Sequence, residues 1–133
     1  MPVPKLIPIA YEPDYRTDTI GRYDDGLFLA SGWDQHIYVH LFTPEGVHRR
    51  SIVQRVSSRT AMDSELDTLL ADLPGKVYGD IAVELFETHH DGILFGLVDE
   101  SGDRAGDGVH VDWAELYPDR LGFHAPWDGL YDT

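Results

Sequence analysis

The sequence predicts an α+β fold: a mostly antiparallel sheet of six to seven strands built from hairpins, with one principal helix on a face. Three observations support this prediction. Apolar runs flank Asp-Gly turn signals at Asp25 and again at Asp91. One segment, about residues 61–73, has the apolar spacing of a helix. The 133 residues are 42% apolar, enough for the core of a single domain spanning 1–133.

The segment from Tyr78 to Glu100 holds the densest apolar sequence and predicts the central hairpin. Its two runs, Ile81–Phe86 and Ile93–Val98, flank a loop that ends in Asp91-Gly92. Asp-Gly readily adopts the positive φ angles of a type I′ turn. This turn places Phe86 opposite Leu97 and Leu85 opposite Val98. The second run is apolar on both faces, so we expect it in the middle of the sheet, covered on one side by the helix.

The N-terminal third predicts further strands. Lys5–Ala10 is expected to form a short edge strand, because proline is tolerated there. Thr19–Tyr23 and Leu27–Ser31 flank Asp25-Gly26, which predicts a hairpin that pairs Tyr23 with Phe28.

Two more strands are expected between residues 36 and 56. His36–Phe42 alternates, with Ile37, Val39 and Leu41 on one face and the two histidines, Tyr38 and Phe42 on the other. Thr43–Gly46 fits a type I turn, and Val47–Val56 returns as a strand. Its arginine pairs indicate a solvated position near an edge of the sheet.

The helix at about residues 61–73 carries an apolar stripe made of Met62, Leu66, Leu69, Leu70 and Leu73. Thr60 and Asp63 have the spacing of a capping box, and Pro74-Gly75 ends the helix. A helix of about three turns is too short to be stable alone, so its leucine stripe must pack on the sheet.

The C-terminal third is less regular. Ser101–Gly108 is rich in Gly and Asp and predicts a mobile loop. Val109, Val111 and Trp113 alternate with polar residues, which predicts a strand, and Pro118-Asp119 predicts a turn. The last stretch, 121–133, has little periodicity and is expected to pack across the sheet as an ordered tail.

The net charge of −14, from 24 acidic and 10 basic residues, disfavours nucleic acid and anionic membranes as partners. It favours a protein partner with a basic surface, although an acidic surface can also serve solubility alone. The bases are unevenly spread, since Arg49, Arg50, Arg55 and Arg59 fall within eleven residues.

The sequence also restricts the location of the protein. It has no cysteine, which excludes disulfides and fits a reducing compartment. The proline-rich N-terminus does not resemble a signal peptide, and no run approaches the roughly 18–20 apolar residues that span a bilayer. We expect a cytoplasmic protein.

Motifs for catalysis or cofactors are missing from the sequence: there is no Gly-x-Ser-x-Gly, no P-loop and no Gly-x-Gly-x-x-Gly. No cofactor is therefore expected. His36 and His40 on one strand would lie about 13 Å apart, too far to share a metal ion. His89-His90 are expected to be exposed turn residues, and His110 with Asp112 offers only two ligands. The loop 99–108 lacks the spacing of an EF-hand. No metal site is predicted.

Two sets of residues remain as candidate sites. Asp80 and Glu84 are the best carboxylate pair for binding a ligand, although acids usually face solvent or pair with arginine. Five aromatic residues lie in Asp-, Pro- and Gly-rich segments and are candidates for an interaction surface, because Trp and Tyr anchor interfaces as well as cores: Trp33, Trp113, Tyr117, Trp127 and Tyr131.

Two stretches carry a resemblance. They are YEPDYRTDTIG at 11–21, followed by a Tyr-Asp-Asp-Gly turn, and WAELYP at 113–118 with GFHAPWDG at 122–129. Together they resemble a family of small bacterial proteins labelled "formate hydrogenlyase regulatory protein". The segment Asp80–Val98 is also similar. The resemblance implies a regulatory role exerted through protein contact, and it supplies no catalytic residues.

These observations favour a non-enzymatic, acidic interaction or regulatory module, and an immunity- or inhibitor-type protein is the subclass to test first. The alternative is a small enzyme or ligand-binding domain that uses Asp80, Glu84 and a histidine in a cleft. A homodimer formed by edge pairing of the N-terminal strands is a third hypothesis.

Overall fold

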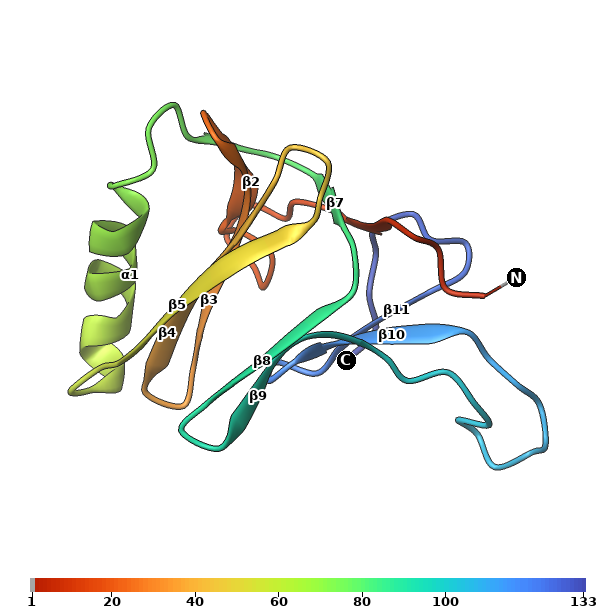
Figure 1. The fold of residues 1–133 in the computed structure, drawn as a ribbon. Helices are drawn as coiled ribbons and strands as arrows, with labels where there is room; N and C mark the ends of the chain where they lie inside the picture. The colour runs from red at the N-terminus through yellow and green to blue at the C-terminus, as the bar shows by residue number, and fades with distance from the viewer. Residues whose placement is uncertain (1) are drawn as a thin grey trace. The chain divides into compact units, whose positions relative to one another are not determined.

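The computed structural model describes residues 2–133 and confirms the α+β class (Figure 1). Within this range the chain forms eleven strands, one α-helix and one short 3₁₀ helix. The strands form three sheets, of five, four and two strands, rather than one sheet of six or seven. The chain divides into two compact units, one spanning Ala10–Ile81 and the other combining the residues up to Ile9 with Ala82–Thr133. We call them the first and the second unit.

The first unit contains the five-stranded sheet, in the order β5-β4-β3-β2-β6. Its strands are β2 (Ile20–Tyr23), β3 (Gly26–Trp33), β4 (His36–Phe42), β5 (His48–Arg55) and β6 (Val77–Tyr78). All seven residues of β4 are buried, so this strand, and not the predicted central hairpin, is the most buried strand of the chain. The prediction that the strand from Val47 to Val56 lies near an edge is confirmed, because β5 ends the sheet.

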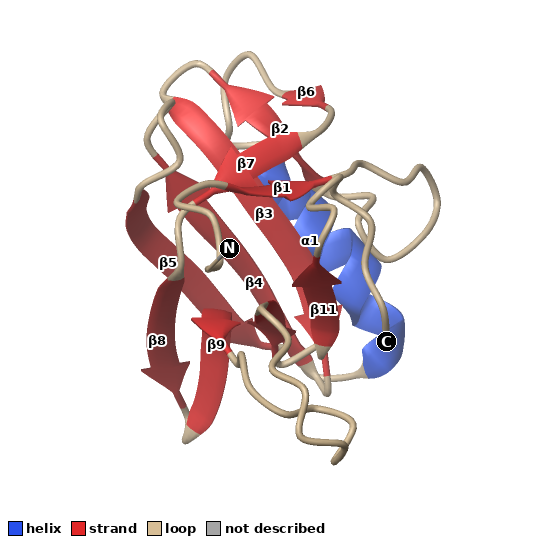
Figure 2. Ribbon diagram, turned by 90° about the vertical axis from the view of Figure 1, so that its right-hand side faces the viewer, coloured by secondary structure: helices blue, strands red, loops and turns tan. Residues whose placement is uncertain are grey.

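Helix α1 (Met62–Leu70) follows the 3₁₀ turn Arg59–Ala61 and packs on β3 and β4, as Figure 2 shows. The predicted apolar stripe is confirmed: Leu66 and Leu70 are buried, and the other three residues pack half-buried against the same core. The prediction that the helix covers the strand Ile93–Val98 is wrong. The stripe packs instead on the aliphatic face of β4, whose Ile37, Val39 and Leu41 belong to the same core.

The ends of α1 differ from the prediction. No side chain caps its N-terminus, so the predicted capping box of Thr60 and Asp63 does not form. The helix ends at Leu70 rather than Leu73, because the next residues turn more tightly: Leu73 N–H donates to Leu70 O at 3.1 Å before Pro74.

The β2–β3 hairpin forms, but with a different register. Tyr23 pairs with Gly26, and Phe28 lies opposite Gly21 rather than Tyr23, so the loop is Asp24-Asp25. Gly26 therefore belongs to β3, where a Cβ would overlap the carbonyl oxygen of Phe42 on β4. The glycine is required for close strand approach rather than for the turn.

The second unit contains the four-stranded sheet, in the order β11-β10-β9-β8. Its strands are β8 (Phe86–His90), β9 (Ile93–Asp99), β10 (Trp113–Tyr117) and β11 (Leu121–His124). The predicted Asp91-Gly92 turn is confirmed, with φ angles of 54° and 75°, as is the pairing of Phe86 with Leu97. The interior position of β9 is also confirmed.

The first half of the predicted hairpin is wrong. Ile81–Val83 forms a separate strand, β7, which pairs with β1 (Ile7–Ile9), and the predicted pair of Leu85 with Val98 does not form. The chain passes from one sheet to the next at Glu84-Leu85. Apolar alternation identifies strands but does not identify their partners, so it could not reveal this break.

The C-terminal strands also differ from expectation. The predicted strand at Val109–Trp113 is an irregular segment with a single bridge between Val111 and Gly102, and the strand β10 begins at Trp113. The expected tail contains β11, which pairs with β10 across the predicted turn at Pro118-Asp119. Among residues 2–133 no helix has both the length and the apolar character needed to cross a bilayer.

The Asp91-Gly92 turn gives a first testable prediction. Gly92→Ala forces a Cβ onto a residue with φ of 75° and should lower the free energy of unfolding by about 1 kcal/mol. The matched control is Gly79→Ala, because a Cβ at Gly79 meets nothing within 4 Å and its φ is not left-handed. Urea denaturation of both variants measures the difference. Equal stability of the two would contradict the prediction.

Candidate functional site

Asp80 and Glu84, the carboxylates selected from the sequence, lie on different segments. Asp80 follows β6, is exposed, and accepts a hydrogen bond from Tyr11 N–H at 2.7 Å. Glu84 lies in the link between β7 and β8 and is half-buried. Asp80 therefore anchors a segment whose Tyr11 ring stacks on Tyr78 at 5.9 Å. Neither carboxylate lines the two cavities described below.

The five selected aromatic residues are divided between the units. Trp33, 36% exposed, ends β3 in the first unit. The other four belong to the second unit and are half-buried. Tyr131 packs against Phe123, with ring centroids 6.0 Å apart, and so supports the core of that unit. The five aromatic residues are thus divided between the two units, and one of them, Tyr131, contributes to the packing of its own unit.

Trp113 and Tyr117 lie on either side of Glu115 on β10, a residue that is only 3% exposed. Its carboxylate accepts hydrogen bonds from Trp113 Nε1 at 3.0 Å, from Arg104 Nη2 at 3.4 Å, and from Arg120 Nε. The Arg104 guanidinium lies 4.2 Å over the Trp113 ring, and that of Arg120 lies 4.9 Å over Tyr117. The two aromatic rings are thus occupied by the chain's own arginines.

Trp127 lines a cavity of about 480 Å³ in the second unit. The other lining residues are His110, Val111, Asp112, His124 and Ala125. His110 Nε2 contacts Asp112 Oδ1 at 2.9 Å. His124 stacks on Trp113 at 4.9 Å, and both of its ring nitrogens contact oxygens of the chain. The polar groups around this cavity are thus largely engaged with one another.

The Asp- and Gly-rich loop closes on itself. Asp103 accepts backbone hydrogen bonds from Gly106, Asp107 and Gly108 at 2.8–3.1 Å. The bond from Gly108, with those from the other two residues, lowers the pKa of Asp103. The loop is therefore held by its own carboxylate, and both Asp103 oxygens serve its backbone.

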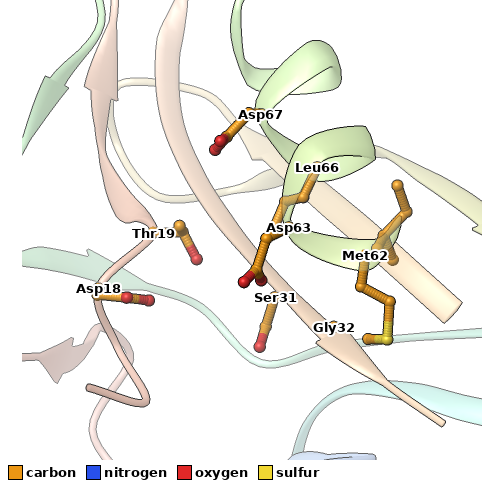
Figure 3. Close-up of a pocket in the computed structure, with 9 residues that line it drawn as sticks. Asp18, Thr19, Ser31, Gly32, Met62, Asp63, Leu66 and Asp67 are labelled. Carbon is orange, nitrogen blue, oxygen red and sulfur yellow. The ribbon is translucent and has the colours of Figure 1, made fainter. Parts of the chain in front are cut away.

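A cleft of about 420 Å³ lies in the first unit and is lined by three aspartates, and we call it the acidic cleft (Figure 3). Helix α1 forms one wall, and the segment leading into β2 forms another. The lining residues are Asp18, Thr19, Ser31, Gly32, Ile37, Met62, Asp63, Leu66 and Asp67. The cleft thus combines a mostly polar lining with carboxylates at its margins, and Figure 3 shows Asp18 and Asp63 on facing walls.

The structure of α1 explains the carboxylates of the cleft. Asp63 and Asp67 are one helical turn apart, so they project on the same side, next to the buried Leu66. Their exposure contrasts with the leucine stripe that fixes the helix on the sheet. Thr19 donates its hydroxyl to Ala30 O, which holds the segment of Asp18 against β3.

The charged residues that line the cleft are all acidic. Within residues 2–133, no lysine or arginine forms an ion pair with Asp18, Asp63 or Asp67. Burial, with smaller contributions from the nearby charges of Asp14 and Asp63, raises the pKa of Asp18. Ionisation of Asp18 in the folded chain therefore costs free energy, and a cation that enters the cleft would reduce this cost.

Sequence reasoning did not identify this cleft. The sequence predicts Asp63 only as a member of the capping box, and no pattern joins Asp18 to it. The i, i+4 spacing of Asp63 and Asp67 beside the leucine stripe was the only available hint.

The cleft does not have the arrangement of a metal centre. Within residues 2–133, no three His, Asp or Glu side chains are grouped so that they could hold a metal ion. Comparisons with models of protein families, with curated proteins and with solved structures found no match. The interpretation of the cleft therefore depends on its own chemistry.

The raised pKa of Asp18 gives a prediction with a defined sign. Because the pKa in the folded chain lies above the ordinary value of 3.8, the charged carboxylate lowers stability at neutral pH. Well below pH 3.8 the group is neutral in both states and the effect disappears. Asp18→Asn should therefore raise the free energy of unfolding at pH 7 by less than about 1 kcal/mol, since solvent still reaches the group.

Thermal melts of the parent and of Asp18→Asn at pH 7 and well below pH 3.8 measure this gain. The control is Asp72→Asn, an exposed aspartate just beyond α1 and outside the cleft. If Asp18→Asn raises stability more in acid than at neutral pH, the prediction is wrong.

Proposed function

We propose that this protein is an acidic interaction module and that its acidic cleft receives a lysine or arginine side chain of a basic partner protein. The observation that carries the proposal is the set of three aspartates without a basic partner, Asp18, Asp63 and Asp67, around one cleft. The net charge of −14 would attract such a partner over longer distances and raise its association rate.

The composition of the cleft favours a long cationic side chain over a small cation. Lysine and arginine place methylene groups on apolar surface and extend their charge to polar groups. Here the half-buried Met62 supplies the accessible apolar surface, and the buried Ile37 and Leu66 lie beneath the cleft. The carboxylates lie beyond them, and Ser31 adds a hydroxyl for hydrogen bonding.

The proposed function is regulatory or inhibitory binding. A module that occupies a basic side chain on the surface of another protein can block that surface, as an immunity- or inhibitor-type protein does. It needs no catalytic group of its own. Such binding is expected to weaken as ionic strength rises, because the charges lie at a solvent-exposed cleft.

A titration with a defined probe tests the proposal. A short lysine-rich peptide should shift the backbone NMR signals of Ser31, Gly32 and Leu66, while a glutamate-rich peptide of equal length should not. Raising the salt from about 20 mM to about 300 mM should weaken binding several-fold. Signals that move evenly over the whole acidic surface would contradict a defined site.

A matched pair of variants separates the cleft from the overall charge. The double variant Asp63→Asn/Asp67→Asn removes two charges from the cleft. The control Asp25→Asn/Asp72→Asn removes two exposed charges elsewhere in the first unit. We expect the first to weaken lysine-peptide binding about fivefold or more and the second less than about twofold. Equal losses in both variants would rule out the cleft as the binding site.

A further inference from the structure

The border strand β5 carries a feature that the acidic cleft does not explain. It is the last strand of the five-stranded sheet, it is eight residues long, and its strand partner is β4 (Figure 1). Border strands present unpaired N–H and C=O groups, which form a template for another chain.

One hydrogen bond shows which backbone groups of β5 point toward β4 and which point away from it. Val56 N–H donates to Gln35 O at 2.8 Å, just beyond the pair Arg55 and His36. In an antiparallel ladder, hydrogen-bonded and non-hydrogen-bonded pairs alternate. Gln54, Ile52 and Arg50 therefore direct their backbone groups toward β4.

By the same alternation, Ser51, Val53 and Arg55 direct their N–H and C=O groups outward. Within residues 2–133, no backbone hydrogen bond reaches these outward groups. The run of outward backbone groups ends near Arg49, where the β4–β5 register shifts at a bulge. The available template is thus the segment Ser51–Arg55.

The charge along this strand is opposite to that of the whole chain. Arg49, Arg50 and Arg55 are exposed, and within the described residues none forms an ion pair with an acidic side chain. Arg49 Nη1 donates instead to the backbone oxygen of Asp25 at 3.2 Å. Three unpaired arginines on one strand contrast with the 24 acidic residues of the chain.

We infer that β5 binds an extended acidic segment of a partner protein, which adds to the sheet as a new edge strand. Backbone hydrogen bonds to Ser51, Val53 and Arg55 hold the segment, and its carboxylates pair with the arginines. Addition of a strand to a free sheet edge is an established mode of peptide recognition. Here the side-chain charge selects the acidic partner.

Charge also excludes a second copy as the occupant. Pairing of β5 with β5 of another molecule would place both sets of Arg49, Arg50 and Arg55 in adjacent strands, where like charges repel. Edge arginines thus prevent self-association and leave the edge open to a partner of opposite charge. This inference is independent of the acidic cleft, whose ligand has the opposite charge.

The test uses a short synthetic peptide in which pairs of glutamate residues alternate with pairs of valine residues, because Arg50 and Arg55 lie on opposite faces of β5. Binding should shift the NMR signals of Ser51, Val53 and Arg55 and slow the hydrogen exchange of their amides. The amides of Ile52 and Gln54 already bond to β4 and should change little. Arg50→Gln/Arg55→Gln should weaken binding roughly three- to tenfold, and the control Arg22→Gln, on β2, should leave it unchanged.

Three further probes separate backbone pairing from charge alone. The same peptide with N-methyl groups on the amides that face β5 keeps its charge but cannot donate, so it should not bind. A peptide with lysine in place of glutamate should also fail. Val53→Pro removes one outward N–H at an edge that tolerates proline and should weaken binding without unfolding the chain.

Each opposite result overturns the inference. Equal binding of the N-methylated peptide would indicate only a basic patch. Equal binding of the lysine peptide would remove the role of the arginines. No binding of the glutamate peptide would exclude the site, and a dimer in solution that Val53→Pro dissociates would identify a second copy as the occupant.

Discussion

Replacing both Arg104 and Arg120 with methionine should lower the free energy of unfolding by about 3–5 kcal/mol, on the order of 10 °C in melting temperature. The reason is the burial of Glu115, which is 3% exposed and receives both guanidinium groups. Without them the carboxylate keeps only the hydrogen bond from Trp113 Nε1. A buried charge without its partners is strongly destabilising, whereas the methionines retain most of the apolar contact with the rings.

The matched test adds Glu115→Gln to the double variant. The neutral amide needs no counter-charge and its oxygen can still accept the Trp113 hydrogen bond, so the triple variant should recover much of the loss. Chemical denaturation of the parent, double and triple variants measures this coupling. If the triple variant is less stable than the double, the arginines do not act through the charge of Glu115.

The local pattern of the sequence predicted several elements well, because each depends on near neighbours. The alternation of Ile37, Val39 and Leu41 identified β4, and the leucine stripe identified α1. The Asp91-Gly92 turn was also predicted, because positive φ is a local property. These signals need no knowledge of the rest of the fold.

Long-range pairing was not predictable in the same way. Ile81–Val83 has the pattern of a strand, but only the fold shows that it pairs with β1 instead of β9. Gly26 suggested a turn, while its true requirement is the close approach of Phe42, sixteen positions later. Glu115 shows the same limitation, because its burial depends on two arginines that alternation does not bring together.

The candidate sites required still more of the fold. The acidic cleft combines Asp18, from an irregular segment, with two aspartates of α1, and no spacing in the sequence joins them. The arginine cluster of β5 was visible in the sequence, but the sequence did not show which of its backbone groups point away from β4. Charge composition alone thus predicts a charged surface, whereas the fold shows that the acidic cleft and the exposed arginines of β5 lie on different elements of the first unit.

The second large effect is expected at Leu70, which is fully buried between α1 and the sheet of the first unit. Leu70→Ala should lower the free energy of unfolding by about 2–5 kcal/mol, because it removes apolar contacts and leaves a cavity. Leu69→Ala is the control, since this neighbour is half-buried and its loss should cost less than half as much. Both substitutions increase helix propensity slightly, so the difference reports packing alone.

This substitution also links the core to the acidic cleft. Asp63 and Asp67 keep their positions only while the stripe holds α1 on β3 and β4. In Leu70→Ala, the amides of α1 should therefore exchange with solvent faster than those of β9 in the second unit. Binding of the lysine-rich peptide should weaken in parallel, and Leu69→Ala should change both much less. Unchanged exchange in α1 together with lost stability would show that the leucine does not anchor the helix.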